Sequence, residues 1–190
     1  MEYTTLPRHQ VRRSDREVTD EEWMRAFLHR APAGYLATVD GDQPYINVNL
    51  FVYDAERHAI YLHTARKGRT RTNLENFPPV CFTVSEMGRL LPAEVALEFS
   101  VEYQSVTMFG RAAVVTDEAE AIRALQLLLD KYFPHLAPGK DYRPPVPDEL
   151  KRTSVFALAI EDWSGKRKQV AGDFPGALFY PSADNGYTPV

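Results

Sequence analysis

Patterns typical of β-strands follow one another along this chain with only short turns between them. Residues 34–39 form one such pattern, Asp40-Gly41-Asp42 supplies turn chemistry, and residues 44–53 continue as a second strand. Further strand patterns cover residues 59–63, 80–85, 100–115 and 154–163. Because helices do not alternate with these strands, the order is unlike that of a parallel sheet built from βαβ units. We therefore predict a mainly β protein, a six-stranded antiparallel barrel with flanking helices, and a β-sandwich is the competing architecture.

The strand pattern at residues 44–53 alternates with period two. Ile46, Val48, Leu50 and Val52 are aliphatic, which predicts a core-facing side. The other side mixes aromatic residues with Asn47 and Asn49. That side is suited to be the wall of a site for a flat polar ligand, or it is an ordinary solvent-facing side.

Two longer helices and one short helix are expected. Thr19-Asp20-Glu21-Glu22 has the pattern of a capping box, and the helix that follows must stop before Pro32. A second helix over residues 117–132 carries an apolar stripe, which predicts packing against the core. The short helix lies near residues 69–76. We divide the chain into an extended arm at 1–18 that reaches a partner subunit, one domain at 19–170 and a tail at 171–190.

Composition limits the classes of function. The formal net charge of the 190-residue chain is −4, which argues against general nucleic-acid binding. No apolar leader or membrane-length apolar run is present, so we expect a cytoplasmic protein without membrane contact. The single cysteine, Cys81, excludes an intrachain disulfide, and the five histidines lack metal-ligand spacing.

A basic segment stands out against this acidic background. The strand pattern that ends in His63-Thr64 is followed by Arg66, Lys67, Gly68, Arg69 and Arg71, and then by the short helix. Cations, free backbone N–H groups and a helix N-terminus all favour a phosphate. The alternative is a solvated basic loop at a sheet edge.

Four segments, in order, resemble a known family. They are His63-Thr64 with Gly68-Arg69; Glu86-Met-Gly-Arg-Leu-Leu-Pro92; the run from Ser100 to Gly110; and the run from Leu150 to Phe156 that leads to Trp163-Ser-Gly-Lys166. Together they resemble the FMN-binding split barrel of the pyridoxamine 5′-phosphate oxidase-like superfamily. Within it, the chain is most similar to the nitroimidazole-resistance flavoproteins. The resemblance implies a homodimer that binds FMN at the subunit interface.

The resemblance assigns the basic segment to the phosphate of FMN. Arg69 matches the family's phosphate-binding arginine, and Lys67 and the Gly68 amide would assist it. The strand with Asn47 and Asn49 matches the strand beside the isoalloxazine ring, where amides would read the polar edge of the flavin.

Further residues are implied around the flavin ring. Gln104 and Ser105 fall where pyridoxamine oxidases place a flavin-contacting glutamine. Trp163 matches an aromatic residue that closes over the flavin from the second subunit, and a core tryptophan is the alternative. His63, with Thr64 beside it, lies next to the flavin site in the resemblance and would be the catalytic residue; otherwise it orients the loop.

The expected activity is that of an FMN-dependent oxidoreductase. Its substrate would be a small nitroaromatic or quinone-like molecule, with NAD(P)H as a candidate electron donor. The segment Ser164-Gly-Lys-Arg-Lys-Gln169 lacks the Arg-x-His element of pyridoxamine oxidases, so the resemblance does not extend to vitamin B6 oxidation. A non-catalytic flavin-binding protein and a haem-binding split barrel with a histidine ligand are the alternatives.

Overall fold

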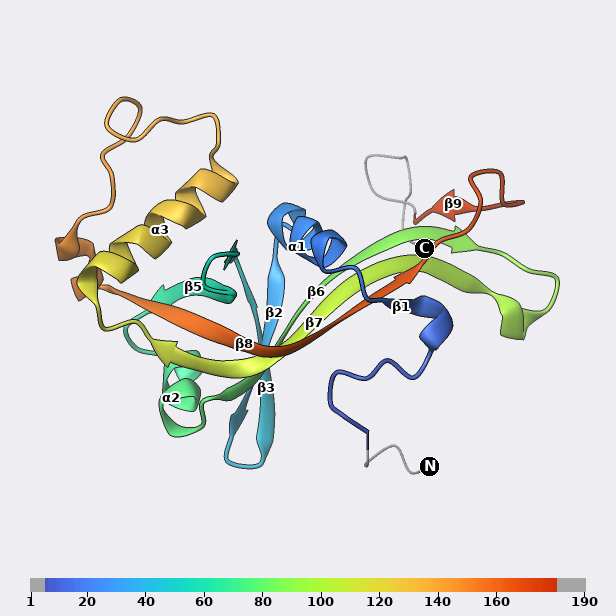
Figure 1. Cartoon of the computed structure of the whole chain (residues 1–190), viewed down its shortest axis with the longest axis horizontal. Coiled ribbons are helices and arrows are strands. Elements are labelled where there is room, and N and C mark those ends of the chain that lie inside the picture. Colours follow the sequence, from blue (N-terminus) through green and yellow to red (C-terminus); the bar gives the residue numbers. More distant parts are fainter. Residues whose placement is uncertain (1–5, 181–190) are drawn as a thin grey trace, which may run out of the picture.

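The computed structural model describes residues 6–180 of the chain (Figure 1). The α-helices are α1 (Glu21–Arg30), α2 (Arg69–Asn76) and α3 (Glu118–Tyr132). The strands are β1 (Glu17–Val18), β2 (Gly34–Asp40), β3 (Gln43–Asn49), β4 (Val52–Asp54), β5 (Ala59–Ala65), β6 (Pro79–Leu91), β7 (Ser100–Val114), β8 (Thr153–Lys168) and β9 (Leu178–Phe179). Short 3-10 helices lie at Ser14–Arg16, Ala96–Glu98 and Pro147–Lys151. Within the described residues, no helix has the length and apolar character needed to span a bilayer.

The strands form one antiparallel sheet in the order β3-β2-β6-β7-β8-β5-β4, with β1 paired to β8 and β9 paired to β6. This confirms the mainly β, antiparallel class, although the described residues hold nine strands, because three are short. The β7–β8 pairing has a register shift between Phe109 and Gly110. Strand β6 extends beyond the strand pattern at residues 80–85 and continues through residues 86–91.

Helices cover the sheet where its strands are most buried. Aspartates cap α1 and α3: Asp20 accepts a hydrogen bond from the Trp23 N–H, and Asp117 accepts one from the Glu120 N–H. Helix α1 packs on the main core, which includes Leu36, Phe82 and Phe156. Helix α3 covers a second cluster on the other side of β5 and β8, while α2 lies on the side opposite α3 (Figure 1).

The expected continuous strand at residues 44–53 is wrong. It divides into β3 and β4, the first and last strands of the sheet order. Because only Leu50 and Phe51 separate them, the sheet must curve until these two strands come close together. The Tyr132 hydroxyl accepts a hydrogen bond from the Phe51 N–H at 3.0 Å and lies 3.2 Å from its carbonyl oxygen. A side chain of α3 therefore satisfies backbone groups that a continuous ladder would have paired.

The prediction that the even positions of this segment face the core is also wrong for β3. Ile46, Val48 and Leu50 are 64%, 57% and 53% exposed, whereas Asn49 is 8% exposed. Only Val52, which belongs to β4, is buried. Because β3 is a terminal strand of the sheet, nothing among residues 6–180 covers its aliphatic face. This row of exposed side chains is called the β3 strip below.

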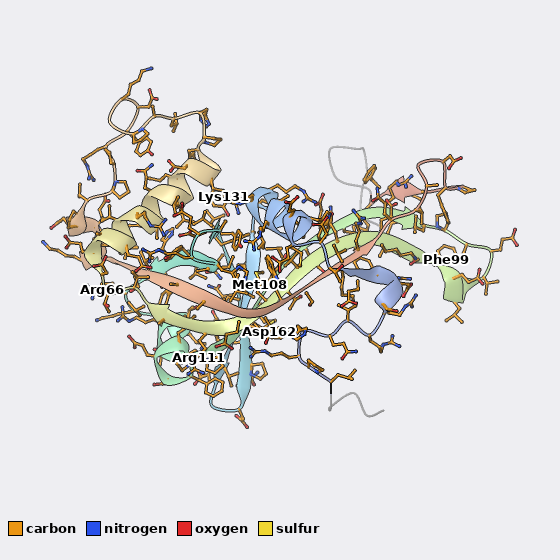
Figure 2. The ribbon with its side chains drawn as sticks, in the orientation of Figure 1. Arg66, Phe99, Met108, Arg111, Lys131 and Asp162 are labelled. Carbon is orange, nitrogen blue, oxygen red and sulfur yellow. The ribbon has the colours of Figure 1, made fainter. Side chains whose placement is uncertain are left out.

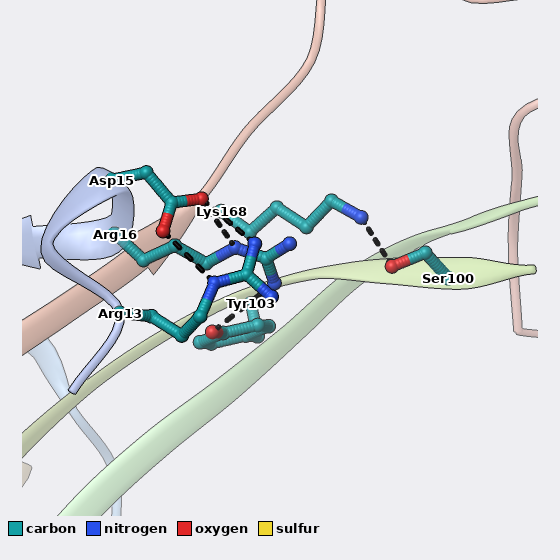
Figure 3. Close-up of polar contacts among 6 residues, drawn as sticks. All are labelled: Arg13, Asp15, Arg16, Ser100, Tyr103 and Lys168. Atoms are coloured by element: carbon teal, nitrogen blue, oxygen red, sulfur yellow. Dashed lines mark hydrogen bonds and ion pairs between the residues drawn. The ribbon is translucent and has the colours of Figure 1, made fainter. Parts of the chain in front are cut away.

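The described part of the N-terminal arm contacts its own chain. Arg8 pairs with Glu161 and Asp162 of β8, at 2.7 Å in both cases. Asp15 accepts hydrogen bonds from Arg13 and Arg16, and Arg16 also approaches the Tyr103 hydroxyl of β7 (Figure 3). Lys168 donates to Ser100 in the same view. Residues 1–5 of the arm and 181–190 of the tail lie outside the described residues.

Candidate functional site

The basic loop joins the end of β5 to the start of α2. Gly68 occupies the N-cap position of α2 with a φ of 149°, a conformation that side chains disfavour. No side chain caps the helix there, and the Gly68 carbonyl accepts the Thr72 N–H at 3.1 Å. The backbone N–H groups of the first turn therefore remain available to an anion at a positive helix end.

The four cations of the basic segment divide into two pairs. Arg66 donates to the Leu150 carbonyl at 3.1 Å, and Arg71 donates to Glu75 and to the Ser154 hydroxyl at 2.8 and 2.6 Å. Lys67 has no hydrogen-bond or ion-pair partner among residues 6–180. Arg69 is 60% exposed at its side chain and lies 3.9 Å from Asp40. Lys67 and Arg69 are thus the two cations that a ligand could engage.

The amide face of β3 lies beside Arg69. The Arg69 guanidinium lies over the Tyr45 ring, 5.3 Å from its centroid. Further along the same face, Asn47 donates to the Asn49 side chain at 3.1 Å, and Asn49 donates to the Asn47 carbonyl at 3.0 Å. Asn73 of α2 is buried and donates to Thr38 of β2 at 2.9 Å, which fixes the helix against this part of the sheet.

His63 and Thr64 point to opposite sides of β5, as adjacent strand residues must. His63 shares the side of Tyr61, which packs in the core cluster under α3. There it lines a cavity of about 540 Å³ together with Leu125, Leu129 and Phe133. The Thr64 hydroxyl donates to the Ala65 carbonyl at 2.9 Å. Partial burial of the imidazole lowers the pKa of His63, although the residue as a whole is exposed.

Gln104, Ser105 and Trp163 lie elsewhere on the sheet. Gln104 donates to Glu86 at 2.8 Å. Ser105 pairs with Lys166, thirteen residues along β8 from Thr153, which pairs with the end of β5. At the usual rise of a strand this is about 43 Å of β8. Figure 2 shows Arg66 at one end of the molecule and Phe99, which adjoins β7, at the other.

Trp163 lies at the centre of the sheet, opposite Met108 in the register and on the side of α1. Its ring contacts His58 edge-on, with centroids 4.7 Å apart, and Arg25 lies over it at 5.2 Å. It is separated from Thr153 by ten residues, or about 33 Å of strand. Trp163 is thus a partly buried residue that packs against the core of its own chain and remains partly accessible.

Comparison with known proteins decides the family. Residues 20–167 match the family model described as pyridoxamine 5′-phosphate oxidase, which covers most of the chain. The chain belongs to the pyridoxamine 5′-phosphate oxidase family. Its fold is therefore the split barrel that we expected from the resemblance. Among curated proteins, no sequence matches this family member significantly.

Solved structures agree with this assignment of the family. The flavocytochrome Anf3 from Azotobacter vinelandii is 26% identical, with a TM-score of 0.74 over 92% of this chain and 85% of that one. The FAD and haem binding protein from Mycobacterium smegmatis is 24% identical, with a TM-score of 0.73 over 82% and 74%. A putative 5-nitroimidazole antibiotic resistance protein from Bacteroides thetaiotaomicron is 20% identical, with a TM-score of 0.65 over 80% and 86%.

On this pyridoxamine 5′-phosphate oxidase fold, one chain brings together only part of the expected site. The group formed by the basic loop and the β3 face contains Asn47, Asn49, Lys67, Gly68 and Arg69. His63 faces away from Thr64. Gln104 and Ser105 lie on β7 and Trp163 lies on β8, all further along the sheet from the basic loop.

Sequence reasoning missed two features of this family member's site. It did not separate Lys67 and Arg69, which a ligand could engage, from Arg66 and Arg71, which donate hydrogen bonds within the chain, and it did not identify Tyr45 as the surface beneath Arg69. The period-two pattern places Tyr45 on the amide face of β3, and this signal could have suggested its role. Within residues 6–180, no group of three or more histidine, cysteine or acidic side chains is arranged to hold a metal ion.

Proposed function

We propose that the protein is a flavoprotein oxidoreductase that binds FMN, with the phosphate at the basic loop. The observation that carries the proposal is the combination of Lys67, Arg69 and an uncapped helix N-terminus at one point of the fold. Two further cations of the loop donate hydrogen bonds within the chain, whereas Arg69 has only a 3.9 Å ion pair with Asp40, so Lys67 and Arg69 are a selective feature rather than a general basic surface. Phosphate is the group of FMN that such a site recognises best.

The residues around the loop have separable roles in this proposal. The Arg69 guanidinium would hold phosphate through two parallel hydrogen bonds, and Lys67 would add a point charge. Asn47 and Asn49 would offer amide donors and acceptors to the polar edge of the ring system. When bound, the flavin supplies the electron-transfer chemistry, and the protein supplies binding, orientation and electrostatics.

We further propose that the site is completed by a second copy of the chain. Ser105 and Trp163 are separated from the basic loop by about 43 and 33 Å of strand, which exceeds the length of one FMN molecule. They can contribute to the same flavin only from a partner. The β3 strip, with its exposed Ile46, Val48 and Leu50, is an apolar surface that a second copy would bury next to the amide face.

The proposed substrate class is supported by the likeness in fold to the putative 5-nitroimidazole antibiotic resistance protein. We propose a small nitroaromatic or quinone-like acceptor, with NAD(P)H as the electron donor entering the flavin cleft. We place the protein in the cytoplasm.

The experiment that tests the proposal begins with the molecule that copurifies with the full chain. Absorbance and mass spectrometry are expected to identify FMN. Reduction of the protein with NADPH, followed by addition of a nitroimidazole or a benzoquinone, should reoxidise the flavin with turnover. Bound FMN without turnover on any such acceptor would support the non-catalytic flavin-binding alternative, and an FAD peak would correct the cofactor.

Haem binding is the second candidate function, alongside the flavin. The flavocytochrome from Azotobacter vinelandii and the FAD and haem binding protein from Mycobacterium smegmatis support it. The observation in this chain that favours it is His63, which faces an apolar cavity away from Thr64. A Soret band in the purified protein, together with flavin absorbance, is the expected sign.

A further inference from the structure

The cavity in front of His63 is separate from the amide face of β3 and the basic loop. It lies between β5, α3 and the segment that leads into β8, and its volume is about 540 Å³. Leu125, Leu128 and Leu129 of α3 form one wall, and Pro145 and Leu50 lie at other sides. This size is within the range of ligand pockets, and the lining is mainly apolar.

We propose that this cavity is a haem site, in which His63 is the axial ligand of the iron and Arg152 holds a propionate. The proposal deepens the second candidate function of the preceding section, because it places the haem at named residues. It also reassigns His63 from the flavin site to a site of its own.

The His63 imidazole meets the requirements of a haem ligand. Among residues 6–180 it has no hydrogen-bond or ion-pair partner, so both ring nitrogens are open. The residue is exposed towards the cavity, and partial burial lowers its pKa, which favours the neutral ring with a lone pair for a metal. His58 differs, because its ring nitrogen is engaged with the Tyr53 hydroxyl at 3.0 Å.

The charges at the cavity also suit a haem. Arg152 lines it and is exposed, and its guanidinium has no hydrogen-bond or ion-pair partner within the described residues. The one carboxylate in the lining, Glu149, accepts hydrogen bonds from Arg143 and from the Val146 N–H, at 2.6 and 3.1 Å. The free group is therefore the guanidinium, which pairs well with a carboxylate such as a propionate.

The α3 stripe explains why this cavity is apolar. Ala121, Ala124 and Leu128 are buried against β4, β5 and β8, as the stripe predicts. Leu125 and Leu129, which belong to the same stripe, instead reach the cavity. The apolar stripe of α3 is thus wider than the part that packs on the sheet, and the remaining residues, Leu125 and Leu129, line the cavity in front of His63.

The first test is a titration of the full-length protein, with its native flavin content, against haemin. We expect one haem per chain and a Soret band typical of imidazole ligation. His63→Ala should lose this spectrum and bind haemin at least about tenfold more weakly. Free imidazole should restore the ligated spectrum in this variant. His135→Ala, which removes an exposed histidine from the loop after α3, is the matched control and should behave as the parent protein.

The second test isolates the propionate contact. Arg152→Gln should weaken haemin binding about ten- to a hundredfold. With the dimethyl ester of haem, which lacks both carboxylates, parent and variant should bind equally. A parent spectrum unchanged by His63→Ala, or no haemin binding by the parent protein, would overturn the assignment.

The flavin proposal and the haem proposal can be tested independently of each other. Flavin content is measured on the same samples by its own absorbance and by mass spectrometry. Loss of haem with retained flavin in His63→Ala supports two separate sites. If His63→Ala loses flavin and keeps the haem spectrum, His63 belongs to the flavin site and the haem assignment is wrong.

Discussion

At the scale of single residues, Gly110 is the glycine with the least space for a side chain. A Cβ built there would lie 1.9 Å from the Ala159 carbonyl oxygen, which is backbone and cannot move aside. We predict that Gly110→Ala lowers the free energy of unfolding by about 1–3 kcal/mol. Gly172→Ala, where a Cβ meets nothing within 4 Å, should change it by less than about 0.5 kcal/mol. Equal urea midpoints for the two variants would contradict this packing.

The sequence predicted which residue types form the candidate site, but it did not predict which of their side chains are available to a ligand. The sequence shows four cations in six residues. Only the tertiary contacts of Arg66 with Leu150 and of Arg71 with Ser154 distinguish these two from Lys67 and Arg69. The same holds for His63 and Trp163. The sequence around each residue does not predict which helix lies beside its side chain, which is α3 for His63 and α1 for Trp163.

At the scale of elements, the long β6–β7 hairpin depends on an ion pair between its strands. Arg89 donates two hydrogen bonds to Glu102, each at 2.9 Å, and Glu102 also accepts the Val170 N–H. Arg89 further donates to the Ala171 and Gly172 carbonyls, so the pair anchors the segment after β8. Gly88 is required beside it, because a Cβ there would lie 2.8 Å from the Glu102 Cβ.

This pair predicts a pH dependence of stability. The hydrogen bonds from Arg89 lower the pKa of Glu102 from 4.5 to about 2. The contribution of the ionised carboxylate to stability is therefore complete above pH 4.5 and is lost as the pH falls towards 2. Glu102→Gln should lower the thermal midpoint at pH 7, and the difference from the parent protein should shrink across that interval. Glu98→Gln, at an exposed position, is the control; a constant difference at all pH values would contradict the assignment.

Element boundaries were predictable where local chemistry sets them. Asp117 begins α3 where the pattern at residues 117–132 places the helix, and α1 begins at Asp20, one residue after the Thr19 that the capping-box pattern predicts as the N-cap. The register shift at Gly110 lies where a glycine interrupts a long strand pattern. The break between β3 and β4 was not predictable, because residues 44–53 alternate without interruption. The strand breaks where the curved sheet brings its first and last strands, β3 and β4, together, and there Tyr132 bonds the backbone of Phe51.

At the scale of the whole molecule, the period-two alternation shows that one face of β3 is apolar, but it does not show which part of the molecule covers that face. Core and interface have the same pattern, and only the fold shows that Ile46, Val48 and Leu50 are uncovered within the described chain. The overall class was predictable because short turns between strands leave few alternatives to an antiparallel sheet.

The β3 strip predicts a linked loss of assembly and cofactor. Val48→Glu places a charge in the proposed interface, and we expect it to convert the dimer to a monomer in sedimentation equilibrium, with most of the flavin lost. Leu136→Glu, at an exposed position of the loop after α3, should leave both unchanged. A flavin-replete monomer would show that the partner contributes nothing to the site.

The central claim is that the loop between β5 and α2 holds the phosphate of the flavin through Arg69. It is tested most directly by the affinities of FMN and riboflavin, which differ only in that phosphate, for the parent protein and two variants. We predict that Arg69→Ala reduces the preference for FMN by about tenfold or more, since a charge-assisted contact is lost. Arg66→Ala, whose guanidinium is bonded to Leu150, should keep most of the preference. An unchanged preference for FMN in Arg69→Ala would contradict the account.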